Sequence, residues 1–166
     1  MMISSDTYAS TNPALCSLIL WSFLKGFEDV NREGCELPIL FIPIPLALSK
    51  SIRETFKGTN NNTGLLTWLS REPQTLLDIS LRIETSKSII KEALIFGNSN
   101  LIILCDENGL FHSSNEGLVQ KRLKEFMDIS GGEDLKEVFT ISRRFGNWCG
   151  QLQSTNIILN IMGMSL

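Results

Sequence analysis

The residue types that could carry out acid–base chemistry are sparse, because His112 is the only histidine among 166 residues. A catalytic histidine needs a nucleophile to deprotonate or a carboxylate that orients it. His112 lies at the end of a predicted β-hairpin, with no nucleophile motif and no evident partnering pair of carboxylates. We therefore expect a surface histidine and no catalytic site.

The cysteines and the glycines carry no binding motif. Four cysteines lie far apart in the chain without a C-x-x-C pair, which predicts reduced and mostly buried thiols rather than a zinc or redox site: Cys16, Cys35, Cys105 and Cys149. Neither G-x-x-x-x-G-K-S/T nor G-x-G-x-x-G occurs, so no phosphate-binding loop is predicted. We expect no metal, no cofactor and no enzymatic activity.

The charge balance is unfavourable for general nucleic-acid binding. The net charge of -3 and the pI near 5.2 oppose the phosphate neutralisation that such binding requires. Two lysines, Lys87 and Lys91, lie on the exposed face of a predicted helix and are the candidate DNA contacts. Glu92 beside them and the acidic tip of the following hairpin favour a solvated or protein-facing surface instead.

The order of the predicted elements indicates a mainly α fold with a small β-hairpin. We expect residues 1–11 to be flexible and 12–166 to form a single compact domain. Within it, 12–57 holds N-terminal helices and a proline-rich extended segment, 64–112 a winged-helix-like unit, and 117–166 the C-terminal helices. No signal peptide or membrane-spanning segment is predicted, so we expect a cytoplasmic protein.

The winged-helix-like unit rests on three helices followed by a hairpin. We expect the helices over residues 64–71, 73–84 and 86–97, with Ser86 capping the third. The strands would flank an Asn108-Gly109 turn, which supplies the positive φ of a tight hairpin. This order is typical of DNA-binding winged helices, so a transcriptional regulator that uses Lys87 and Lys91 is the alternative function.

The first predicted helix has more apolar positions than one core face can use. Asn12 and Pro13 start it, and it runs to about Phe27 with apolar residues nearly all round. Part of that circumference is therefore expected to face a partner protein, with the following residues as candidates: Leu15, Leu18, Trp21 and Phe23.

Short stretches along the chain resemble the middle component of bacterial three-component ABC systems. They are Asn12-Pro13-Ala14-Leu15-Cys16, Leu20-Trp21, Lys25-Gly26, Leu37-Pro38-Ile39-Leu40-Phe41, Pro45-Leu46, Leu65-Leu66-Thr67-Trp68-Leu69, Glu92-Ala93-Leu94-Ile95-Phe96-Gly97, Arg144-Phe145-Gly146-Asn147-Trp148 and Ile157-Ile158-Leu159-Asn160-Ile161-Met162-Gly163.

The resemblance implies a non-catalytic adaptor that bridges an SMC- or Rad50-like ABC ATPase and an effector protein. Such systems are similar to Lamassu and defend bacteria against phage and plasmids, and DNA would be reached through the complex. The resemblance implies no active-site residues for this chain.

Overall fold

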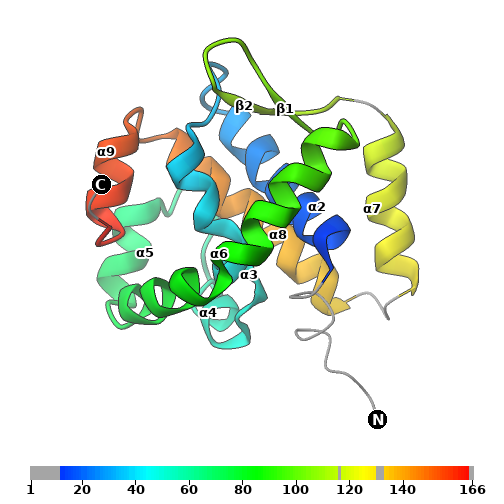
Figure 1. Cartoon of the computed structure of the whole chain (residues 1–166). Coiled ribbons are helices and arrows are strands. Elements are labelled where there is room, and N and C mark those ends of the chain that lie inside the picture. The colour runs from blue at the N-terminus through cyan, green and yellow to red at the C-terminus, as the bar shows by residue number, and fades with distance from the viewer. Residues whose placement is uncertain (1–11, 116, 130–132, 165–166) are drawn as a thin grey trace.

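The computed structural model describes residues 12–115, 117–129 and 133–164, and within them it is mainly helical with one antiparallel hairpin (Figure 1). The predicted fold class is thereby confirmed. The expected flexible segment, 1–11, lies outside the described residues. The buried apolar side chains form one cluster with members from α2 through α9.

Helix α2 (Pro13–Glu28) runs through the middle of the structure (Figure 1). The Asn12 side chain accepts hydrogen bonds from the backbone N–H groups of Ala14 and Leu15 at 3.0 and 3.2 Å, and Pro13 occupies the first turn. This is the predicted helix start. The Asn12 side-chain oxygen satisfies two N–H groups of the first turn, and Pro13 has no N–H that would need an acceptor.

Helix α8 (Glu133–Gly150) packs closely along α2. The approach is possible because glycines lie at the contact: an added Cβ at Gly26 would be 1.8 Å from the Arg143 carbonyl oxygen, and one at Gly146 would be 2.0 Å from that of Phe23. The Ser142 hydroxyl also donates to the Ile19 carbonyl at 2.8 Å. The two helices therefore touch backbone to backbone.

The proline-rich segment is helical, so the predicted extended conformation is wrong. It forms the 3-10 helix η1 (Leu37–Phe41) and the α-helix α3 (Pro43–Leu48), followed by α4 (Lys50–Glu54). Pro38 and Pro43 each lie in a first turn, where the missing N–H would have no helical acceptor. Successive short helices thus accommodate the prolines.

The winged-helix expectation fails at its second and third helices. Helix α5 (Leu65–Arg71) is present, but a single helix, α6 (Thr75–Ser99), replaces the two helices that were expected to divide near Ser86. The Thr85 hydroxyl lies 3.1 Å from the Arg82 carbonyl and 3.4 Å from that of Leu81, so the side chain bonds within the helix instead of ending it. The turn that was expected between the second and third helices is therefore missing.

The hairpin and the C-terminal helices match the predicted order. Strands β1 (Ile103–Cys105) and β2 (Phe111–Ser113) pair antiparallel, and Gly109 has a φ of 77° in the turn. Helices α7 (Gly117–Ile129) and α9 (Thr155–Ile161) follow, on opposite sides of the molecule (Figure 1).

Three aromatic rings fill the core where α5 meets α8. Phe56 stacks on Trp148 with centroids 5.1 Å apart, and Trp68 lies 5.6 Å from Trp148. The indole N–H groups donate to Thr55 Oγ1 and to the Asn60 carbonyl, each at 2.9 Å. Trp68 and Trp148 are both fully buried.

Candidate functional site

His112 lies between two carboxylates, which corrects the expectation from sequence. Its Nε2 is 2.8 Å from Asp106 Oδ2, and its Nδ1 is 4.0 Å from Glu28 Oε1. Glu28 belongs to α2, so the fold brings in a carboxylate from 84 positions earlier in the chain, which local sequence could not reveal. The hydrogen bond to His112 is the main cause that lowers the pKa of Asp106 from its ordinary 3.8.

This cluster fastens the hairpin to α2. The Glu28 carboxylate accepts hydrogen bonds from the Ser113 backbone N–H and from its hydroxyl, both at 2.6 Å. The Ser113 hydroxyl therefore donates to a carboxylate and not to the imidazole, whereas an activated nucleophile would donate to the imidazole. Gly34, at a φ of 108°, leaves room for the His112 ring, which an added Cβ would approach to 2.7 Å. The geometry is that of a structural clamp.

Three of the four thiols are buried, as predicted, and Cys105 is exposed. Burial raises the pKa of Cys16 to about 12 and raises those of Cys35 and Cys149 as well. A protonated thiol is a poor nucleophile and a poor metal ligand. Within the described ranges, no group of three or more His, Cys, Asp and Glu side chains could hold a metal ion, and no helix is long and apolar enough to cross a membrane.

The candidate DNA contacts, Lys87 and Lys91, both lie exposed on α6, and Lys87 pairs with Glu84 at 3.0 Å. Their role stays a prediction, although the helix that presents them is not the separate recognition helix expected. Arg143 pairs with Asp29 at 3.3 Å, while Arg144 donates to the Thr59 hydroxyl at 3.2 Å.

The expected partner surface on α2 is inside the protein. Leu15, Leu18 and Phe23 are at most 1% exposed, because α6, α8, α3 and the hairpin surround α2. Other elements of this chain therefore cover the apolar side chains around α2. The inference that Leu15, Leu18 and Phe23 face a partner is wrong. Trp21 is also buried, at 6% exposure, and its indole N–H donates to the Ser114 carbonyl at 2.8 Å.

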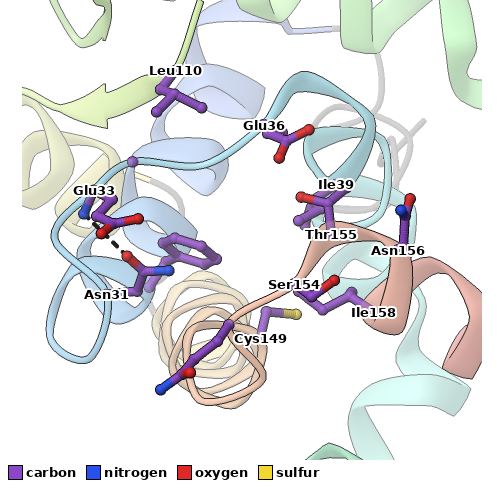
Figure 2. Close-up of a pocket in the computed structure, with 13 residues that line it drawn as sticks. Asn31, Glu33, Glu36, Ile39, Leu110, Cys149, Ser154, Thr155, Asn156 and Ile158 are labelled. Carbon is purple, nitrogen blue, oxygen red and sulfur yellow. Dashed lines mark hydrogen bonds between the residues drawn. The ribbon is translucent and has the colours of Figure 1, made fainter. Parts of the chain in front are cut away.

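A polar pocket of about 290 Å³ lies between the loop after α2 and the start of α9. Figure 2 shows Asn31 and Glu33 on one side and Thr155 and Asn156 on the other. The lining holds two carboxylates, no basic side chain, and the Cys149 thiol, whose pKa burial raises. This pocket therefore lacks both a reactive nucleophile and a counter-charge that would fix an acidic ligand.

A second hollow, the α7–α8 groove, has a volume of about 570 Å³ and is lined mainly by apolar surface. Its apolar lining consists of the buried Trp21 of α2 and Phe139 of α8 and the half-buried Leu123 and Met127 of α7. Five exposed polar or charged side chains also line it: Lys124, Asp128, Lys136, Thr140 and Arg143. Trp21 is thus the single member of the predicted interface set that lines an open surface among the described residues.

Helix α7 makes the groove because it is amphipathic. Val119 is buried, Leu123 and Met127 are partly buried, and these positions recur at the four-residue spacing of one helix face. Lys124 and Asp128 of the same helix are exposed and also line the groove. The sequence predicted C-terminal helices from residue 117 onward but not the surface against which α7 packs.

Comparison with protein families matches residues 2–166 to the family described as ABC-three component (ABC-3C) system Middle Component 3. No curated protein and no solved structure matches the chain.

Proposed function

Because this chain belongs to the ABC-three component (ABC-3C) system Middle Component 3 family, we propose that it is a non-catalytic accessory subunit. In this role it connects an SMC- or Rad50-like ABC ATPase to an effector protein. The observation that carries the proposal is the family match along residues 2–166, since a middle component of a three-component system has other components to bind.

Two features of the structure support an assembly role. The groups best suited to chemistry are engaged internally: His112 bonds Asp106, and the Ser113 hydroxyl bonds Glu28. In contrast, the α7–α8 groove offers apolar surface beside charged side chains, which is the composition of protein-binding sites.

The defence role follows from the same resemblance. We infer that the complex acts against phage and plasmids in a Lamassu-like manner, with foreign DNA sensed by the ATPase and the effector held inactive until then. The accessory subunit would set the relative position of the other two components.

Co-expression of the three components of one system tests this proposal. With an affinity tag on this chain, we expect both other components to co-purify and to co-elute in size-exclusion chromatography. A matched co-expression with the unrelated ATPase of another system controls for unspecific retention. If this chain always elutes alone, the proposed function is wrong.

A further inference from the structure

The α7–α8 groove has the shape of a site for a helical segment. All ten of its lining residues belong to the helices α2, α7 and α8, so no strand edge is available to pair with an extended peptide. Its volume of about 570 Å³ accommodates several side chains. Amphipathic helices bind such grooves through apolar anchors at i, i+3 or i+4, and i+7.

The charge around the groove indicates what kind of helix fits. Three basic side chains and one acidic side chain line it, namely Lys124, Lys136, Arg143 and Asp128. The chain as a whole carries a net charge of -3, so this surface is opposite in sign to the rest. A further cation, Lys25, lies over the Trp21 ring at 5.3 Å from its centroid.

Lys124 and Lys136 are the basic groups best placed to act on a ligand. Both are exposed, and they line the groove from two different helices, α7 and α8. Arg143, by comparison, already has an ion pair with Asp29. Acidic residues beside the apolar anchors of a bound helix would therefore meet one lysine from α7 and one from α8.

We infer that the α7–α8 groove binds an amphipathic, acidic helical segment of another component of the same system. Its apolar anchors contact Trp21 and Phe139, and its carboxylates contact Lys124 and Lys136. This inference rests on the proposed function, and it adds the surface and the chemistry of the recognised segment.

The test uses the full chain and synthetic peptides tiled across the other two components of its system. We expect one peptide that carries apolar residues at helical spacing and flanking Asp or Glu to bind in fluorescence anisotropy. The double variant Lys124→Glu/Lys136→Glu should weaken its binding by at least about tenfold, because two attractions become repulsions. The double variant Lys50→Glu/Lys57→Glu changes the same charges at two exposed positions in and after α4, and it should bind as the wild type does.

A charge swap makes the test specific. A peptide with its Asp and Glu residues replaced by Lys should lose affinity for the wild type and regain it with Lys124→Glu/Lys136→Glu. Both lysines are exposed, so circular dichroism of the variant should match the wild type. Wild-type affinity of a folded Lys124→Glu/Lys136→Glu chain, or equal losses in both double variants, would overturn the inference.

The failure of this inference differs from the failure of the proposed function. If the three components assemble but the groove variant joins the complex normally, the groove assignment is wrong and the subunit role stands. If no complex forms with the wild type, the role itself is wrong. If the wild-type chain dimerises and Lys124→Glu/Lys136→Glu is monomeric, a second copy occupies the groove and the inference is also overturned.

Discussion

Replacing Gly26 or Gly146 by alanine should destabilise the protein strongly, because both glycines lie where α2 and α8 touch. A Cβ at Gly26 would be 1.8 Å from the Arg143 carbonyl oxygen, and one at Gly146 would be 2.0 Å from the Phe23 carbonyl oxygen. An ordinary contact is at least 3.4 Å, so the backbones would have to separate by about 1.5 Å.

The expected cost exceeds the gain that alanine brings to a helix. Overpacking a tight core costs about 1–3 kcal/mol or more, and here the clash is with backbone atoms that cannot rotate away. Alanine recovers only about 1 kcal/mol of helix propensity over glycine. We therefore expect each single variant to lose at least about 2 kcal/mol, or not to fold.

Urea unfolding of the isolated chain, followed by circular dichroism, measures this loss. Gly117→Ala is the matched control, since open space surrounds its Cβ position at the start of α7, and its change should stay within about 0.5 kcal/mol. The double variant Gly26→Ala/Gly146→Ala should cost less than the two single losses together, because one separation of the helices relieves both clashes. An unfolding midpoint equal to or above that of the wild type in either single variant would refute the close-contact argument.

Three further predictions concern the clamp and the thiols. The pKa of Asp106 is lower in the folded chain, so its contribution to stability is full above pH 3.8 and is lost as the pH falls below that value. In an acid titration followed by circular dichroism, the Asp106→Asn variant should therefore lose stability less steeply than the wild type. An identical profile for the two proteins would contradict the role of His112. Glu28→Ala should cost about 1–3 kcal/mol in urea unfolding, because it leaves the Ser113 donors without their acceptor, whereas a loss below 0.5 kcal/mol, on the scale of a surface change, would count against the clamp. When the native protein is alkylated at about pH 8, mass spectrometry should find Cys105 modified first. The buried thiols of Cys16, Cys35 and Cys149 should react only after unfolding, and early labelling of any of the three would contradict their burial.

The helix starts and the hairpin turn could be predicted because they depend on neighbouring residues. Asn12 with Pro13 marks the start of α2, Ser154 caps α9 through Ile157, and Asn108-Gly109 marks the turn between β1 and β2. Each signal is a local hydrogen bond or a local backbone preference, so the surrounding fold does not alter it.

The failures come from competition between local alternatives. The Thr85-Ser86 pair can cap a helix or bond back within one, and α6 uses the second option. Prolines exclude a helix interior but not a first turn, and η1 and α3 use that exception. Such choices are decided by the packing of α6 and α3 against α2, which no short stretch of sequence encodes.

The candidate groove could not be predicted from the sequence, because its lining combines α2 with α7 and α8, which are distant from α2 in the chain. Trp21 was identified as a partner-facing residue from the apolar circumference of α2, yet that circumference is covered mainly by this chain. Gly146 and Gly150, one turn apart on α8, are the signal that could have revealed the cover: small residues at four-residue spacing allow a close helix contact.

The central position of α2 also bears on how the protein is made. The helix is synthesised about 100 residues before α8 is, which at ordinary translation rates is an interval of roughly 5 to 20 s. During that time its apolar surface lacks its main cover, and the nascent chain depends on transient contacts or a chaperone to stay soluble. Premature termination before α8 would make this exposure permanent, so truncated products are expected to aggregate and be degraded.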